Sequence, residues 1–171
     1  MKEFSIYLRY VEAKDAALIL DWENNEENWA VSENDSPYSL FDIHVLIGEL
    51  QDIPNAKQAR WMICLSENDE AIGNIDLTEI DFKKKEATVG ILVACKEYRQ
   101  KGIASKSLQL IEDESIRLGV EKFICSVHKD NLASCQLFLK NNFRKIGEKK
   151  EPNSSEDEYI DVLLFEKWLK K

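Results

Sequence analysis

The sequence of 171 residues predicts one mixed α/β domain, and three observations support this fold class. Hydrophobic residues make up 44% of the chain, enough for a buried core at this length. Runs with alternating hydrophobic residues, typical of strands, are interspersed with runs of helical periodicity. Neither an internal repeat nor a linker divides the chain, so we assign residues 1–171 to a single domain.

The N-terminal part predicts one strand and two helices. In residues 4–11 every second side chain is hydrophobic, which predicts a strand. Asp15 precedes a helix expected over residues 16–23, and Ser39 precedes another over residues 40–50; both residue types are favoured N-caps. In the second helix the apolar positions repeat at intervals of three and four, as one buried helical face requires.

The middle of the chain predicts three strands followed by a long helix. Residues 60–65, 71–79 and 87–95 are apolar runs joined by polar turns, a pattern that predicts an antiparallel meander. The hydrophobic period changes after Glu97. Apolar residues then repeat every three or four positions over residues 104–118, which indicates an amphipathic helix.

The C-terminal part predicts a strand, a helix and two closing strands. The strand covers residues 123–127 and the helix covers residues 131–141. The closing strands are expected at residues 143–146 and 159–165, with a charged loop over residues 148–158 between them. The resulting order is β-α-α-β-β-β-α-β-α-β-β.

Composition and charge exclude several classes of partner. The net charge of −9 disfavours nucleic acid, whose phosphates such a surface repels. No apolar run reaches the roughly 18–20 residues that span a membrane, and residues 1–4 do not resemble a signal peptide, so we expect a cytoplasmic protein without a membrane partner. Residues 1–59 hold 12 acidic and 4 basic residues, a net charge of −8. This excess either forms a solvated surface or attracts a cationic acceptor.

The cysteines and histidines do not predict a metal site. None of the four cysteines forms a C-x-x-C pair, and the two histidines lie far apart in the sequence. Cys64 and Cys125 fall in runs that predict buried strands, where a free thiol packs as a small hydrophobic group. We therefore expect no bound metal and reduced core thiols.

The most informative segment joins the strand at residues 87–95 to the long helix. A helix N-terminus leaves unpaired N–H groups and a partial positive charge, and a diphosphate fits there. Gly102 lets a backbone approach phosphates without an intervening Cβ, and Ala104 keeps the next turn open. Residues 96–106 carry four basic residues and one acidic residue, a net charge of +3 in an acidic protein. By itself this pattern also fits an ordinary turn-to-helix junction.

In this context Arg99-x-x-Gly102-x-Ala104 resembles the acetyl-CoA signature of the GNAT superfamily, which reads Gln/Arg-x-x-Gly-x-Gly/Ala. The family's signature follows a strand and opens a helix, as expected here. The preceding Tyr98 is also typical of the family.

A second segment agrees with the first. Asn131-x-x-Ser134 and the run at residues 138–143 resemble a later family segment, although Asn142 replaces the usual Gly. Asn tolerates the left-handed conformation needed after a helix, so this change is mild. The resemblance extends over residues 8–165 and is closest to the branch of ribosomal-protein alanine acetyltransferases and spermidine acetyltransferases.

The resemblance implies a mixed, mostly antiparallel central sheet that is V-splayed, flanked by helices, and holds acetyl-CoA in the splay. It implies direct attack of a primary amine on the thioester in a ternary complex, the amine being a polyamine, a protein N-terminus or a small amine. The oligomeric state stays open, with a homo-oligomer among the alternatives. The residues implied to bind acetyl-CoA are Ile91, Leu92, Val93, Arg99, Gln100, Lys101, Gly102, Ile103, Ala104, Asn131, Ser134 and Phe138.

The catalytic groups are less clear, because two positions depart from the family pattern. Many relatives carry Tyr where this chain has Phe138, which has no proton to donate. Relatives often carry Glu near the start of the fourth strand, where this chain has Thr88. Asp76 is the candidate base, because strand alternation places it on a polar face with Asn74 and Thr78, although a solvated strand face fits the same pattern. At its helical spacing Phe138 also fits plain core packing.

These departures keep a second interpretation open, a non-catalytic acyl-CoA-binding sensor or interaction protein. On the acceptor side, acidic residues of the N-terminal part would attract an amine, and two tryptophans would form apolar walls or belong to the core. These residues are Glu23, Glu26, Glu27, Glu33, Asp35, Trp22 and Trp29.

Overall fold

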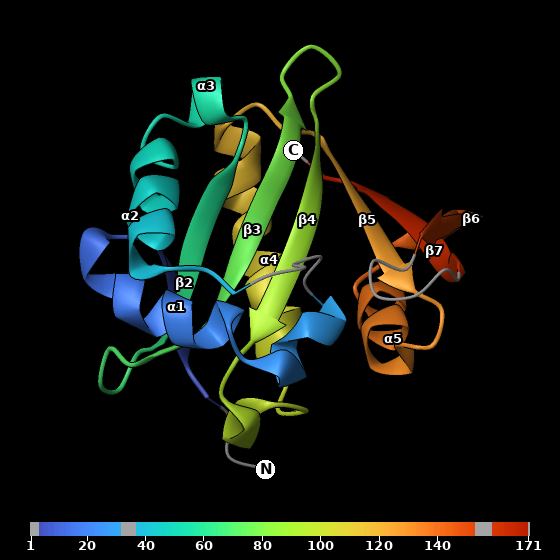
Figure 1. The fold of residues 1–171 in the computed structure, drawn as a ribbon. Helices are drawn as coiled ribbons and strands as arrows, with labels where there is room; N and C mark the ends of the chain where they lie inside the picture. The colour runs from blue at the N-terminus through green and yellow to red at the C-terminus, as the bar shows by residue number, and fades with distance from the viewer. Residues whose placement is uncertain (1–3, 32–36, 153–158, 171) are drawn as a thin grey trace.

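The computed structural model describes residues 4–31, 37–152 and 159–170, and its centre is a seven-stranded sheet (Figure 1). The strand order is β1-β2-β3-β4-β5-β7-β6. All neighbouring strands are antiparallel except β4 and β5, which confirms a mixed, mostly antiparallel sheet. The strands are β1 (Ile6–Tyr10), β2 (Ala59–Leu65), β3 (Ala71–Asp81), β4 (Glu86–Val93), β5 (Lys122–His128), β6 (Arg144–Pro152) and β7 (Tyr159–Trp168).

Helices flank both faces of the sheet. In Figure 1, α1 lies in front of the lower ends of β2 and β3 and α2 lies to the left of β2, while α4 lies behind the sheet. Within the described residues no helix is long and apolar enough to cross a membrane. The helices are α1 (Ala16–Glu23), α2 (Leu40–Glu49), α3 (Ile53–Ala56), α4 (Ile103–Arg117) and α5 (Leu132–Lys140), with 3-10 turns η1 (Ala13–Asp15), η2 (Glu26–Val31) and η3 (Lys96–Tyr98).

Two hydrophobic cores form because strand side chains alternate between the faces. In β2, Met62 and Cys64 pack with the apolar faces of α1 and α2. Trp61 and Ile63 point the opposite way and join the core under α4. All four side chains are at most 1% exposed, so β2 is buried on both faces. Cys64 and Cys125 are buried free thiols, as expected, and burial raises the pKa of both.

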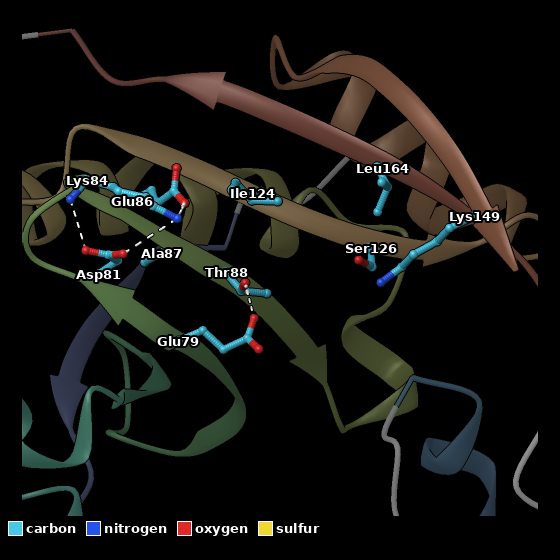
Figure 2. A pocket seen from close by; sticks show the side chains of 10 residues that line it. All are labelled: Glu79, Asp81, Lys84, Glu86, Ala87, Thr88, Ile124, Ser126, Lys149 and Leu164. Atoms are coloured by element: carbon cyan, nitrogen blue, oxygen red, sulfur yellow. Dashed lines mark hydrogen bonds and ion pairs between the residues drawn. The ribbon is translucent and has the colours of Figure 1, made fainter. Parts of the chain in front are cut away.

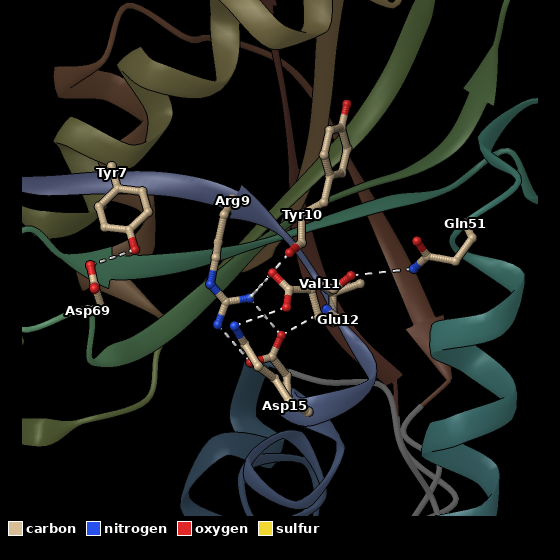
Figure 3. A network of polar contacts seen from close by, with 9 residues as sticks. Tyr7, Arg9, Tyr10, Val11, Glu12, Asp15, Gln51 and Asp69 are labelled. Atoms are coloured by element: carbon tan, nitrogen blue, oxygen red, sulfur yellow. Dashed lines mark hydrogen bonds and ion pairs between the residues drawn. The ribbon is translucent and has the colours of Figure 1, made fainter.

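Of the two predicted N-cap residues, Ser39 caps its helix through its side chain and Asp15 does not. The Ser39 side chain accepts a hydrogen bond from the backbone N–H of Asp42 and caps α2. Asp15 occupies the N-cap position of α1, but its side chain makes no cap bond there. Its carboxylate instead accepts two hydrogen bonds from Arg9, each 2.8 Å, and one from the backbone N–H of Glu12 (Figure 3).

This Arg9–Asp15 pair ties β1 to the start of α1. Burial alone would raise the pKa of the Asp15 carboxyl, but the hydrogen bonds from Arg9 and from the Glu12 backbone outweigh it and lower the pKa. Figure 3 shows a second tie beside it, where the Gln51 amide donates to the carbonyl oxygen of Val11. The edge strand β1 is thereby fixed to the first two helices.

The sheet opens between β4 and β5. These parallel strands pair at Glu86 with Lys122, Ala87 with Phe123 and Thr88 with Ile124. Beyond Thr88 the two strands separate, as Figure 1 shows, while β5 remains paired with β7 along its whole length. The V-shaped splay expected from the sequence is therefore present.

Two elements differ from the sequence expectation. A short helix, α3, begins after Asp52, whose side chain caps it, and has Pro54 in its first turn. Strand β6 continues to Pro152, although a loop was expected from residue 148. The charged side chains of β6 lie at the sheet edge and are mostly exposed, a place where charge is favourable because it discourages pairing with other chains.

Candidate functional site

The junction between β4 and α4 presents an open helix N-terminus. The N-cap is Gly102, which has a φ of 79° and no side chain to cap the first turn. A Cβ placed at Gly102 would meet no atom within 4 Å, so the space beside this cap is open. Gln100, two positions earlier, also has a positive φ of 59°. The backbone N–H groups of the first turn are thus available to an anion.

The side chain of Arg99 is used to build this junction. Its Nε donates to the carbonyl oxygen of Val93 at 2.8 Å, and a terminal nitrogen donates to that of Ala94 at 3.2 Å. The same nitrogen donates to the Asn28 side chain at 3.0 Å. Arg99 therefore links the end of β4, the loop before α4 and η2. The backbone, rather than this guanidinium, is what the structure offers to an anion.

The other predicted residues of this segment lie around the same helix start. Ile103 is buried in the core, and Ala104 is half-buried in the first turn of α4. The ammonium group of Lys101 lies 5.4 Å from the centre of the Phe4 ring. Its charge adds to the positive end of α4.

The end of β4 lies unusually close to β3. A Cβ added to Gly73 would lie 2.1 Å from the carbonyl oxygen of Leu92, so only glycine fits there. The backbone N–H groups of Ala94 and Cys95 both donate to the carbonyl oxygen of Ile72, at 2.9 and 3.2 Å. This close pairing fixes the strand end that leads to Gly102.

The predicted strand residues of the site lie on this fixed segment. Ile91, Leu92 and Val93 are half-buried and pair with β3 on one edge. Their other edge faces the splay, because β4 and β5 no longer pair there. Backbone groups on that edge are open to a ligand lying between the strands.

The three predicted cofactor-binding residues of the α5 segment differ in burial: Asn131 and Ser134 are half-buried, and Phe138 is buried. The Asn131 side chain accepts from the backbone N–H of Ser134 at 3.1 Å, and both residues are half-buried at the start of the helix. Phe138 is 5% exposed and packs edge-on against Phe143 at 4.9 Å and stacks on Phe165 at 6.3 Å. The structure thus places Phe138 in an aromatic core, as one of the two alternatives expected.

Asp76 lies in a partly buried ion pair. Both of its oxygens accept from Arg60 at 2.8 Å, and the Asn74 amide donates to it at 3.1 Å. A third nitrogen of Arg60 donates to Glu23 at 3.0 Å. Burial alone would lower the pKa of the Arg60 guanidinium, but Asp76 and Glu23 outweigh it and raise the pKa. This pairing gives Asp76 a structural task that its sequence pattern did not reveal, and its role as a base stays a prediction.

A pocket of about 330 Å³ lies where β4 and β5 part (Figure 2). Glu79 lines this pocket, and its carboxylate accepts a hydrogen bond from the Thr88 hydroxyl at 2.9 Å. Sequence reasoning missed Glu79 because it stands at the expected end of a strand and looks like a solvated terminus. The lining residues are Glu79, Asp81, Lys84, Glu86, Ala87, Thr88, Ile124, Ser126, Lys149 and Leu164.

Two of the acidic residues expected on the acceptor side, Glu23 and Glu27, form ion pairs within the chain. Glu27 forms an ion pair with Lys96 at 2.7 Å, and the Lys96 hydrogen bond lowers the pKa of its carboxyl. Trp22 is 8% exposed and belongs to the core of α1 and α2. Glu33, Asp35 and the side chain of Trp29 lie outside the described part of the chain. Among the described residues no group of three or more His, Cys, Asp and Glu is arranged to hold a metal ion.

Solved structures share this fold. Spermidine N-acetyltransferase from Vibrio cholerae in complex with CoA and spermine has a TM-score of 0.82 and 23% identity, covering 96% of this chain and 95% of that chain. RimL, a ribosomal L7/L12 alpha-N-protein acetyltransferase in complex with CoA, has a TM-score of 0.82 and 19% identity, covering 96% and 94%.

Sequence comparisons give the family. An N-acetyltransferase named p20 from Bacillus licheniformis is 26% identical over 161 residues, which are 92% of this chain and 89% of that protein. The model described as the acetyltransferase (GNAT) domain matches residues 5–144, most of the chain. The match includes the β4–α4 junction and its Gly102 cap. The chain therefore belongs to the GNAT family of acetyl-CoA-dependent N-acetyltransferases.

Proposed function

We propose that this protein moves the acetyl group of acetyl-CoA to a primary amine by direct attack in a ternary complex. The observation that carries the proposal is the uncapped N-terminus of α4 at Gly102, beside the open edge of β4. It offers backbone donors to a diphosphate and a slot for the arm that follows. The amine is a polyamine, a protein N-terminus or a small amine, in keeping with relatives named for spermidine and for a ribosomal protein.

Different residues along the splay would hold different parts of acetyl-CoA. The first turn of α4 and the loop before it, residues 99–104, would hold the diphosphate. Ile91, Leu92 and Val93 would flank the pantetheine arm, with Asn131 and Ser134 on the opposite strand–helix unit. When bound, acetyl-CoA supplies an activated thioester at the apex of the splay.

The acceptor would approach through the pocket of Figure 2. This pocket is lined by residues from both sides of the β4–β5 separation and contains three carboxylates against two lysines. An amine is cationic at neutral pH and is attracted by such a lining. The long-range negative charge of the protein adds to this attraction.

A panel of amines assayed for release of free CoA tests the proposal. Spermidine, a peptide with a free N-terminus and a simple primary amine represent the three acceptor classes. We expect release with one class, and stabilisation of the fold by roughly 2.7 kcal/mol when CoA is present at about 100 times its Kd. CoA binding without turnover on any amine would favour a non-catalytic acyl-CoA sensor, and absence of any CoA binding would contradict the assigned cofactor site.

We further propose that the chain forms a homo-oligomer. A spermidine N-acetyltransferase from Vibrio cholerae with the same fold is described as dodecameric. In this chain the exposed face of α2 carries apolar side chains, including Phe41 at 74% exposure. Light scattering of the purified protein measures the state directly, and a monomer at all concentrations would contradict it.

A further inference from the structure

The pocket at the apex of the splay contains one carboxylate without a cationic partner. Glu86 pairs with Lys122 at 2.6 Å, and Asp81 accepts backbone N–H groups from the turn that follows it and lies 3.8 Å from Lys84. Glu79 has no lysine, arginine or histidine partner within the described part of the chain. Its bond is to the neutral hydroxyl of Thr88. Glu79 is thus the pocket carboxylate that is free to pair with an incoming ammonium group.

The backbone turns Glu79 toward the pocket. Ile75 and Leu77 point into the core under α4, and simple alternation would send Glu79 the same way. The pairing of β3 with β4 instead shifts register between Thr78 and Asp81, and Glu79 has a φ of 50°. Ile80 fills the core in its place.

A bulge of this kind re-aims a side chain, and a positive φ at a non-glycine residue is an unfavourable backbone conformation. Figure 2 shows the result: the Glu79 carboxylate is directed at the Thr88 hydroxyl of the neighbouring strand β4. An ordinary strand would have avoided both the strain and a carboxylate in this pocket.

Glu79 lies where the proposed acetyl transfer needs a base. Thr88 is the last residue of β4 that pairs with β5, so the Glu79–Thr88 hydrogen bond lies at the point where the splay begins. Asp76, on the same strand, has both oxygens occupied by Arg60. Of these two carboxylates, Glu79 is the one placed at the apex and left without a cation.

We propose that Glu79 accepts a proton from the ammonium group of the acceptor amine, and that Thr88 positions its carboxylate; this inference rests on the proposed acetyl transfer. Glu79 takes one proton from the ammonium and passes it to solvent. The freed amine lone pair forms the C–N bond while the C–S bond breaks, and a second nitrogen proton ends on the departing sulfur. One proton is released per acetyl group transferred.

Four variants test the assignment with the best amine of the panel. Glu79→Gln should lower kcat/KM at pH 7 by about 10²-fold. The loss should shrink at higher pH, where the free amine forms without a base. Thr88→Val should lower kcat/KM several-fold and alter the same pH profile, whereas Thr88→Ser keeps the hydroxyl and should behave as the wild type. Glu49→Gln, at an exposed glutamate of α2, is the matched control.

Two further measurements separate the outcomes. Calorimetry should give unchanged CoA affinity for Glu79→Gln, because the residue lies beyond the cofactor arm. If the wild type is active and Glu79→Gln stays within threefold of it at every pH, Glu79 is not the base. If Asp76→Asn instead shows the pH-dependent loss of kcat/KM, and its melting temperature is unchanged, the proton goes to Asp76. A wild type that acetylates no amine overturns the proposed function itself, and this inference with it.

Discussion

Two glycines shape the site for different physical reasons. Gly102 is required by its backbone conformation, because a φ of 79° is costly for other residues and the helix needs an open cap. Gly73 is required by proximity, because the Leu92 carbonyl oxygen occupies the space of a Cβ. The first glycine leaves room for a ligand, and the second leaves room for the neighbouring strand.

Gly102→Glu should abolish CoA binding while the fold persists. The new carboxylate would stand where the phosphates are expected, yet a helix N-terminus tolerates a negative charge. Calorimetry with CoA and a melting curve measure the two effects. Gly48→Glu makes the same change on the exposed surface of α2 and is the control. Unchanged CoA affinity in Gly102→Glu would move the diphosphate site elsewhere.

Gly73→Ala should destabilise the protein by about 1–3 kcal/mol, because the methyl group forces β3 and β4 apart. Gly90→Ala is a matched comparison, since a Cβ at Gly90 meets no atom within 4 Å. Urea unfolding of both variants provides the measurement. If the two variants lose the same free energy of unfolding, the Leu92 carbonyl group can move aside without destabilising the protein.

At the scale of elements, the junction of β1 with α1 should make stability depend on pH. The folded protein holds the pKa of Asp15 below its usual value of about 3.9. A lowered pKa means that the stabilising contribution is present above pH 4 and is lost as the pH falls through the folded-state value. Asp15→Asn should therefore destabilise the protein at pH 7, with a difference from wild type that shrinks toward pH 3. Urea unfolding at both pH values measures it, and a constant difference would argue against the Arg9–Asp15 pair as the cause.

Helix α5 supports the C-terminal half through Phe138. The ring packs against Phe143 and Phe165 and is 5% exposed, so an added hydroxyl would lack a partner. Phe138→Tyr should lose roughly 1–3 kcal/mol of stability and keep its specific activity. Melting temperature and amine-dependent CoA release are measured on the same sample. A stable variant with faster turnover would instead place the ring beside the thioester.

The sequence predicted the elements better than their fine register. Long apolar patterns located the strands and α4, because burial imposes their periods, and the cap motif located Gly102. The Arg60–Asp76 pair was missed, since it depends on which residues of β2 and β3 stand opposite each other. Glu79 was missed for a related reason: a bulge changes the face of a side chain without leaving a periodic trace.

At the scale of the whole molecule, the splay divides the sheet into two parts. Strands β1–β4 form one part and β5, β7 and β6 the other, joined by three residue pairs among the described strands. CoA bound between them should slow hydrogen exchange at backbone amides of residues 89–93. Exchange measured by mass spectrometry with and without CoA tests this. Residues 61–64, paired on both sides, are the internal control, and equal protection with and without CoA would place the ligand outside the splay.

The splay also has a consequence for solubility. A sheet normally has two edges, but this one has two more in its interior, along β4 beyond Thr88 and β5 beyond Ile124. Unpaired edges are templates for strands of other molecules, and the charged side chains that blunt β6 have no counterpart in the apolar run Ile91, Leu92 and Val93. A ligand lying in the splay covers these edges. Purified protein kept without CoA should therefore self-associate faster on warming than the same protein kept with CoA. The co-substrate would then also protect the protein from aggregation.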